Sequence, residues 1–357
     1  MHAPITVLIV DDSALIRGMF REMLESEPDI VVLDTATDPI DAREKIKRLN
    51  PDVLTLDIEM PKMDGLSFLE KIMTLRPMPV IMASSLTQKG ADATVRALEI
   101  GAFDYISKPA MHQTRDTIGA LKEALVTKVR AAAAANMGAR ARSAPAAQSA
   151  PLVVPFHPSH SNAHRLIAIG ASTGGVEALR EIFLRLPANA PPIVVTQHMP
   201  ESFTKSFAAR LNTLSAVTVS EAAQHERLKQ GHAYIAPGGA CHLKIVKLGS
   251  EYVCKLEDSP PVSSHKPSVD VLFHSVAEAA GAHAIGVILT GMGKDGAAGL
   301  KAMRERGAYT IGQNQASCVV YGMPNVAAKL GATQIELPLA DIPAAMLAHY
   351  EIMEKRA

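Results

Sequence analysis

The segment Leu166–Gly175 constrains the fold more than any other stretch, because it joins a strand, a sharp turn and a helix start. It begins with a short apolar run typical of a buried strand. The run ends in a Gly-x-Ser-x-Gly motif centred on Ser172, and a helical pattern starts at Val176. Such a unit exposes the serine hydroxyl at the carboxyl edge of a parallel sheet, beside a helix N-terminus. By itself the motif also fits a glycine turn that packs a helix or cradles a phosphate.

Composition narrows the class of protein. The 357 residues suffice for two domains, and 36 basic residues balance 36 acidic ones. Zero net charge, 4% aromatic residues and no Trp argue against nucleic-acid binding. Three scattered cysteines (Cys241, Cys254 and Cys318) fit a reducing compartment. With no signal-peptide pattern and no apolar run of membrane-spanning length, the sequence predicts a cytoplasmic protein without membrane insertion.

Residues 5–130 alternate apolar runs with amphipathic segments five times, which predicts a parallel sheet with helices on both faces. The first domain is assigned to residues 4–125. The expected strands are 7–10, 30–33, 53–56, 80–83 and 103–106, and the expected helices are 14–25, 39–49, 65–75, 89–100 and 114–130. Residues 126–163 are then assigned to an interdomain linker, since most of them are small or proline-broken and lack apolar periodicity.

Residues 164–350 predict a second, doubly wound and mainly parallel α/β domain. Its expected parallel strands are 166–169, 193–197, 217–219, 284–290 and 308–312, and its expected helices are 176–186, 202–212, 269–281, 297–306 and 323–330. Three further runs, 233–236, 243–247 and 252–256, are expected to be short antiparallel strands. The tail near 341–355 is expected to form an amphipathic helix.

In the first domain, polar residues follow strand ends, where open α/β sheets place their sites. They are Asp11, Asp12, Asp57, Ser84 and Lys108. Clustered carboxylates favour a divalent cation, and hard oxygen ligands suit Mg²⁺. A carboxylate beside the metal can accept a phosphoryl group, which a lysine and a small hydroxyl can then bind. Taken singly, each acidic residue also fits a turn or a helix N-cap.

This domain resembles the receiver domain of two-component response regulators, which has a flavodoxin-like (βα)5 fold. The resemblance rests on Asp11-Asp12, on 57–65 (Asp-Ile-Glu-Met-Pro-x-Met-Asp-Gly), on Ser84 and on 104–109 (Asp-Tyr-Ile-Ser-Lys-Pro). It implies that Asp57 is the phosphoacceptor and that a chemotaxis-type histidine kinase is the phosphodonor. It further implies that Asp12, Asp57 and the Glu59 carbonyl bind Mg²⁺, with Asp11 close by. Ser84, Tyr105 and Lys108 would form the switch.

In the second domain, a serine nucleophile requires a base and an acid that orients the base. His198 directly follows the run 193–197, and consecutive parallel units place their strands side by side. Asp295 follows another strand, in a glycine-rich turn before a helix. His198 could instead make a strand-end hydrogen bond, and Asp295 could cap a helix. Together with Ser172 they predict a Ser-His-Asp triad at one sheet edge.

The order Ser, His, Asp differs from the order in α/β-hydrolases. Residues 164–350 instead resemble the catalytic domain of the chemotaxis receptor methylesterase, the CheB family. The matching segments are 167–175, 197–200 (Gln-His-Met-Pro), 231–239, 264–270 (Ser-His-Lys-Pro-Ser-Val-Asp), 289–299 and 321–324. One departure is Lys266, where the family usually has arginine, which puts a bidentate contact in doubt. Residues 264–270 also fit an ordinary surface loop before a helix.

The resemblance implies a phosphorylation-activated enzyme that removes methyl groups from glutamate methyl esters on methyl-accepting chemotaxis receptors. Deamidation of receptor glutamines is expected as well. The implied roles are nucleophile for Ser172, general base and acid for His198, orienting carboxylate for Asp295 and oxyanion donor for the Met292 N–H. The elbow geometry adds Thr173 N–H as a second donor. No cofactor is expected in this domain, and the chain is expected to be a monomer.

Two other classes of function remain open from the residues alone. One is a nucleotide-binding or dehydrogenase domain that uses the glycines of 170–175 as a phosphate cradle. Two features of the sequence argue against this interpretation. The segment has no third glycine in the register of a Gly-x-Gly-x-x-Gly motif, and His198 occupies the position at the end of the next strand where such domains have an acidic residue. The other is a non-enzymatic regulator whose second domain docks on partners.

Overall fold

A computed structural model describes residues 3–60, 63–85, 87–109, 115–135, 153–156 and 164–356. The chain divides into two compact units, Met1–Arg140 and Ala141–Ala357. Most of the expected linker lies outside the described residues. None of the helices in the described ranges has the length and apolar character needed to cross a membrane.

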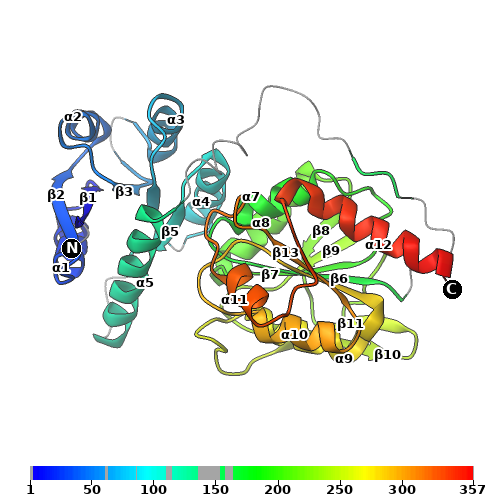
Figure 1. Cartoon of the computed structure of the whole chain (residues 1–357). Helices are drawn as coiled ribbons and strands as arrows, with labels where there is room; N and C mark the ends of the chain where they lie inside the picture. The colour runs from blue at the N-terminus through cyan, green and yellow to red at the C-terminus, as the bar shows by residue number, and fades with distance from the viewer. Residues whose placement is uncertain are drawn as a thin grey trace. The chain divides into compact units, whose positions relative to one another are not determined.

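The first unit is a five-stranded parallel sheet in the order β2-β1-β3-β4-β5. Its strands are β1 (Ile5–Val10), β2 (Ile30–Ala36), β3 (Val53–Asp57), β4 (Val80–Ser84) and β5 (Asp104–Ser107). Its helices are α1 (Ala14–Glu25), α2 (Pro39–Leu49), α3 (Gly65–Leu75), α4 (Gln88–Ile100) and α5 (Arg115–Ala133). Helices α1 and α5 cover one face of the sheet and α2, α3 and α4 the other (Figure 1). The predicted flavodoxin-like architecture is confirmed.

Polar N-caps fix where these helices begin. Ser13, Asp38, Asp64 and Thr87 accept hydrogen bonds from first-turn N–H groups of α1, α2, α3 and α4. Because Ser13 begins α1 directly after β1, the two preceding residues, Asp11 and Asp12, lie in the short loop at the carboxyl end of that strand.

The second unit is a seven-stranded sheet, parallel throughout, in the order β14-β13-β12-β6-β7-β9-β8. Its strands are β6 (Leu166–Ala171), β7 (Ile193–Gln197), β8 (Thr218–Glu221), β9 (His232–Ile235), β12 (Ala284–Ile288), β13 (Tyr309–Gln313) and β14 (Ile335–Leu337). The predicted doubly wound, mainly parallel fold is confirmed.

Six α-helices and two 3₁₀ turns of the described residues complete this unit. They are α7 (Gly175–Phe183), α8 (Glu201–Leu214), α9 (Val269–Ala280), η1 (Gly281–His283), α10 (Ala297–Glu305), α11 (Met323–Lys329), η2 (Leu339–Asp341) and α12 (Ile342–Arg356). Helices α7, α8 and α12 lie on one face of the sheet and α9, α10 and α11 on the other (Figure 1). The expected tail helix is α12.

The antiparallel assignment of 233–236 is wrong. This run is β9, which pairs in parallel with both β7 and β8 inside the main sheet. Only β10 (His242–Leu248) and β11 (Glu251–Glu257) form the antiparallel hairpin, which packs on α9. An apolar run shows that a strand is buried but does not give its direction, which depends on the connection before it. The short strand β14 was not expected, because its residues are largely exposed.

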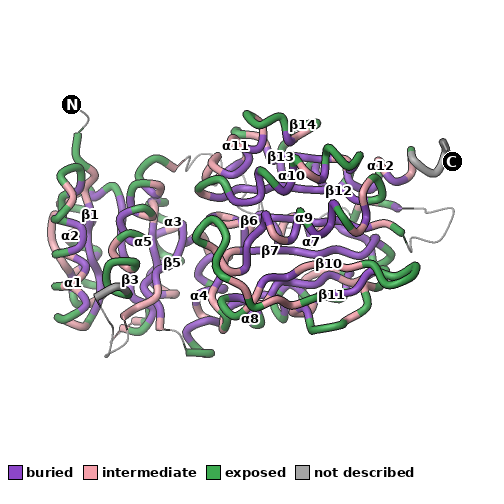
Figure 2. The backbone as a smooth tube through the Cα atoms, turned by 90° about the horizontal axis from the view of Figure 1, so that it is seen from below, coloured by how far each residue is buried: buried purple, intermediate pink, exposed green. Residues whose placement is uncertain are grey.

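Both sheets are buried layers, since their central strands are covered on both faces (Figure 2). In the first sheet the strand order reverses between β1 and β3, and in the second between β6 and β12. At such a reversal, the two flanking helices leave in opposite directions and open a crevice at the carboxyl ends of the strands. The loops after β1 and β3, and after β6 and β12, therefore line the two places where ligands are expected.

Candidate functional site

Ser172 stands in a tight turn between β6 and α7. Its N–H donates to the Thr290 carbonyl at 3.1 Å, and its own carbonyl accepts the Gly175 N–H at 2.8 Å. Gly174 caps the helix with a φ of +77°, a left-handed conformation that a side chain would strain. The turn leaves Ser172 half-buried at the carboxyl edge of the sheet, as a nucleophile requires.

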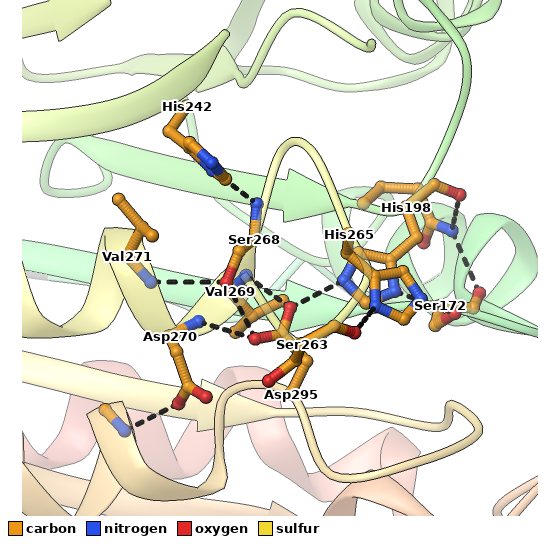
Figure 3. Close-up of polar contacts among 12 residues, drawn as sticks. Ser172, His198, His242, Ser263, His265, Ser268, Val269, Asp270, Val271 and Asp295 are labelled. Carbon is orange, nitrogen blue, oxygen red and sulfur yellow. Dashed lines mark hydrogen bonds and ion pairs between the residues drawn. The ribbon is translucent and has the colours of Figure 1, made fainter. Parts of the chain in front are cut away.

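His198 follows β7, the strand beside β6 in the sheet. Its Nδ1 lies 3.1 Å from Ser172 Oγ, and its Nε2 lies 2.8 Å from Asp295 Oδ2 (Figure 3). Since the carboxylate only accepts hydrogen bonds, Nε2 carries a proton and donates it. In the neutral ring Nδ1 is then the acceptor for the serine hydroxyl. The structure brings all three predicted triad residues together, which gives the hydroxyl a base and the base an orienting anion.

Asp295 is fixed by the start of α9 as well as by His198. Ser268 Oγ donates to its Oδ1 at 2.7 Å, the Asp270 N–H donates to the same oxygen at 3.1 Å, and the Val269 N–H donates to Oδ2 at 2.7 Å. Burial by itself favours the neutral acid, but the hydrogen bonds from His198, Ser268 and Val269 lower the pKa of Asp295 below its ordinary value. The buried carboxylate is therefore kept charged.

The loop after β12 passes directly against Ser172. A Cβ added to Gly291 would lie 2.8 Å from Ser172 Cβ and 2.2 Å from Met323 Sδ. Only glycine permits this approach, and Met292 is the next residue of the loop. Thr173 is held from the same side, because its carbonyl accepts the Thr290 hydroxyl at 3.0 Å. The oxyanion roles of Met292 and Thr173 stay predictions, supported by this proximity.

The sequence reasoning missed several residues that shape this site. Gln197, at the end of β7, donates through Nε2 to the Ser172 carbonyl at 2.9 Å. The His265 ring is stacked on His198, with 3.7 Å between ring centroids. Both residues lie inside segments that were matched to the family, but no spacing rule links them to the triad. Lys266 pairs with Asp258, so its ammonium group binds a neighbouring loop.

In the first unit, Lys108 joins the two buried carboxylates. Its Nζ lies 2.8 Å from Asp11 Oδ2 and 2.8 Å from Asp57 Oδ1. Burial, reinforced by the charge of Asp11 and only partly offset by Lys108, raises the pKa of Asp57 to about 6. The two carboxylates thus share a single ammonium group, so the cluster keeps an excess of negative charge.

This excess suits a magnesium ion. One ligand atom from each of Asp11, Asp12 and Asp57 lies within 4.8 Å of the others. Asp57 Oδ2 is buried without a hydrogen-bond donor, although buried carboxylate oxygens are nearly always paired. The residues therefore fit a hard divalent cation. Glu59 donates its N–H to Asp57 Oδ1 at 3.2 Å, and its side chain is exposed near Lys89. The carbonyl ligand predicted at Glu59 stays a prediction.

Of the predicted switch residues, Ser84 ends β4 and Lys108 follows β5 at the same edge, whereas Tyr105 lies within β5. The Ser84 hydroxyl contacts α4, because it donates toward the Gly90 carbonyl at 3.1 Å and accepts from the Thr94 hydroxyl at 2.7 Å. Its backbone carbonyl accepts the Lys108 N–H at 2.7 Å. Tyr105 is buried, with Lys128 Nζ 4.9 Å from its ring centroid. Their roles in switching stay predictions.

Comparison with known proteins matches both units to described families. A model of the response regulator receiver domain matches residues 7–118, and a CheB methylesterase model matches residues 167–346. A protein-glutamate methylesterase/protein-glutamine glutaminase of Bordetella parapertussis is 56% identical and covers 95% of each chain. A protein of the same description from Chromohalobacter salexigens is 54% identical over 97% of this chain and 96% of its own.

A solved structure agrees with the fold of the second unit. The CheB methylesterase catalytic domain of Thermotoga maritima is 40% identical and has a TM-score of 0.50. It covers 52% of this chain and 97% of its own.

Proposed function

This chain belongs to the CheB methylesterase family, in the form that carries a response regulator receiver domain, and we propose that Ser172, His198 and Asp295 are its catalytic triad. It is a protein-glutamate methylesterase/protein-glutamine glutaminase. The observation that supports the triad is the unbroken hydrogen-bonded chain from hydroxyl to imidazole to buried carboxylate.

The geometry suggests a two-step ester hydrolysis. Ser172 Oγ attacks the carbonyl carbon of a glutamate methyl ester, and its proton passes to His198 Nδ1 across 3.1 Å. The resulting imidazolium is stabilised by Asp295. Collapse of the tetrahedral intermediate breaks the bond to methoxide, which takes the proton from His198 and leaves as methanol. Water, deprotonated by His198, then hydrolyses the glutamyl ester on Ser172 and regenerates the hydroxyl.

The same steps apply to a primary amide, which expels ammonia instead of methanol. Both reactions pass through a tetrahedral oxyanion, for which we assign the backbone N–H groups of Met292 and Thr173 as donors. Gly291 supports this assignment, because its lack of a side chain lets the loop lie against Ser172. The proposed substrates are methylated glutamates and glutamines of methyl-accepting chemotaxis receptors.

Replacing the nucleophile tests the triad. Ser172→Ala should lower methanol release from methylated receptor membranes by about 10⁴-fold or more, because the acyl intermediate can no longer form. Ser250→Ala, in the exposed turn of the hairpin, is the matched control and should behave as the parent does. Undiminished hydrolysis by a folded Ser172→Ala protein would remove the triad from consideration.

Regulation is assigned to the first unit. Asp57 is proposed to accept a phosphoryl group from a histidine kinase, with Asp11, Asp12 and Asp57 holding Mg²⁺. When bound, the ion would neutralise charge on the transferring group. Lys108 already contacts Asp57 and would pair with a phosphoryl oxygen, while Ser84 would turn its hydroxyl toward another. Phosphorylation is proposed to raise methylesterase activity.

A small-molecule phosphodonor tests this regulation without a kinase. Methanol release by the parent should rise when the donor and Mg²⁺ are added together. Asp57→Ala should keep the basal rate and lose the response, because no carboxylate remains to be phosphorylated. If Asp57→Ala responded as the parent does, the acceptor would lie elsewhere.

A further inference from the structure

The imidazole of His265 covers one face of the catalytic histidine. The two ring centroids are 3.7 Å apart and the planes differ by only 16°, so the rings lie face to face (Figure 3). His198 is thereby held in its plane by Ser172 and Asp295 and on one face by His265. His265 comes from an otherwise exposed turn, so its contact with His198 is not explained by burial of the segment.

That turn is a tight two-residue hairpin. Val262 and His265 exchange two backbone hydrogen bonds, of 3.0 and 2.9 Å. Between them Ser263 and Ser264 have φ angles of +51° and +64°, in the left-handed region that disfavours residues with a side chain. Two-residue hairpin turns of type I′ need positive φ at both central residues, so this pair fixes the path of the chain into His265. Both serines are exposed.

The turn also fixes the orientation of the His265 ring. Its Nδ1 lies 2.6 Å from the Ser263 carbonyl, so Nδ1 carries the proton that is donated to this oxygen. Three residues further on, Ser268 donates to the triad carboxylate of Asp295. The segment 262–270 therefore contacts two members of the triad, His198 through the ring of His265 and Asp295 through three hydrogen bonds.

A shared metal ion is the other arrangement to consider, because His198, His265 and Asp295 bring ligand atoms within 4.8 Å of one another. The ring geometry does not favour it. Imidazole lone pairs lie in the ring plane, and in two stacked rings they run side by side, whereas a tetrahedral metal needs them to converge. Both nitrogens of His198 are also engaged by Ser172 and Asp295.

We propose that His265 is a positioning residue for the hydrolysis, acting through a ring stacked on His198. This inference rests on the proposed triad. The two hydrogen bonds of His198 resist rotation within the ring plane, but they resist tilting out of it only weakly. A flat ring on one face opposes that tilt and keeps water from that face of the imidazole. The π-face also favours the cation that His198 becomes when it takes the serine proton.

Two substitutions test the contribution of the His265 ring separately from that of its hydrogen bond to Ser263. His265→Phe keeps a flat aromatic ring and loses the hydrogen bond to Ser263, whereas His265→Gln keeps a donor for that carbonyl and loses the ring. With the full chain and methylated receptor membranes, the Phe variant should retain kcat within about three-fold. The Gln variant should lose about ten-fold or more in kcat with little change in KM, since misplacement of a reacting group costs rate more than binding.

A second readout removes the receptor from the measurement. The rate of covalent labelling of Ser172 by a serine-directed phosphonate should follow kcat, falling in the Gln variant and recovering in the Phe variant. Thermal unfolding of both variants controls for folding. Equal losses in both variants, no loss in either, or a loss confined to KM would each overturn the stacking role.

The experiments distinguish a failure of the His265 proposal from a failure of the proposed triad. If Ser172→Ala abolishes hydrolysis while both His265 variants match the parent, the triad stands and the positioning role is wrong. If Ser172→Ala leaves hydrolysis intact, the triad itself is wrong and the role of His265 falls with it.

Discussion

Asp295 shows how a single carboxylate is tuned by its surroundings. Its oxygens accept from His198, from Ser268 and from two backbone N–H groups at the start of α9. The positive end of a helix macrodipole and these donors together favour the anion. Because the hydrogen bonds from His198, Ser268 and Val269 lower its pKa below the ordinary range, Asp295 stays ionised across the range in which histidines usually titrate.

Asp295→Asn is therefore expected to be far more damaging than its small change in shape suggests. The amide cannot supply the negative charge that stabilises the imidazolium, and it can favour the wrong tautomer of His198. We expect kcat for methanol release to fall by about 10³- to 10⁴-fold. Asp341→Asn, at the exposed turn η2, is the matched control. A kcat within ten-fold of the parent would contradict the orienting role.

The pKa of Asp57 is shifted in the opposite direction, upward. This shift predicts the sign of the change in the free energy of unfolding with pH. Its pKa rises from an ordinary 3.8 to about 6. Between these values the folded state binds more protons than the unfolded state, so the free energy of unfolding falls as the pH rises. In EDTA, the parent should lose about 1 kcal/mol relative to Asp57→Asn between about pH 5 and about pH 7. Chemical denaturation at both pH values measures this, and parallel behaviour of the two proteins would contradict it.

At the scale of elements, strand ends and the loops that follow them decide which side chains meet. Ser172 follows β6, His198 follows the neighbouring β7, and Asp295 lies in the loop after β12, on the other side of β6. The loop after β12 reaches Ser172 only because Gly291 has no side chain. Packing at Gly291 and the hydrogen bond from the Ser172 N–H to the Thr290 carbonyl together set the distance between this loop and Ser172.

Gly291→Ala tests that packing. The new Cβ would meet Ser172 Cβ at 2.8 Å, closer than real Cβ contacts come, so the loop or the nucleophile must shift. We expect methanol release to fall by about 100-fold, since small misplacements at the reacting centre are costly. Gly18→Ala in α1, where a Cβ would meet nothing within 4 Å, is the control. Full activity of Gly291→Ala would show that the approach is not required.

At the scale of the whole molecule, the two candidate sites lie in different α/β units. The acidic cluster of Asp11, Asp12 and Asp57 lies in the first unit and the proposed triad in the second. Each site stands at the strand reversal of its own sheet, in accordance with the rule for open α/β folds. Metal-dependent phosphorylation and ester hydrolysis should therefore be separable by simple reagents.

Metal removal makes this separation measurable. EDTA should abolish the response of methanol release to a phosphodonor and leave the basal rate within about two-fold, because the stacked geometry of His198 and His265 does not suit metal ligation. Added Mg²⁺ should restore the response. A large fall in the basal rate that Mg²⁺ or Zn²⁺ reverses would place a required metal in the second unit.

Much of the fold followed from local patterns. Apolar runs bounded by turn residues located most strands, and the polar residues that follow those runs predicted Ser172, His198 and Asp57 as candidate site residues. The direction of β9 did not follow, since alternation and burial are the same in either direction. His265 did not follow either, because an exposed turn carries no periodic signal and its contact with His198 joins residues far apart in sequence.

The sequence by itself determined which residue types stand at strand ends, because burial and turn chemistry are local and leave their pattern in the chain. Strand order, the approach of the loop after β12 and the stacking of His265 were decided by tertiary structure. Those features depend on which elements pack beside each other, and packing joins residues that no short window of sequence contains.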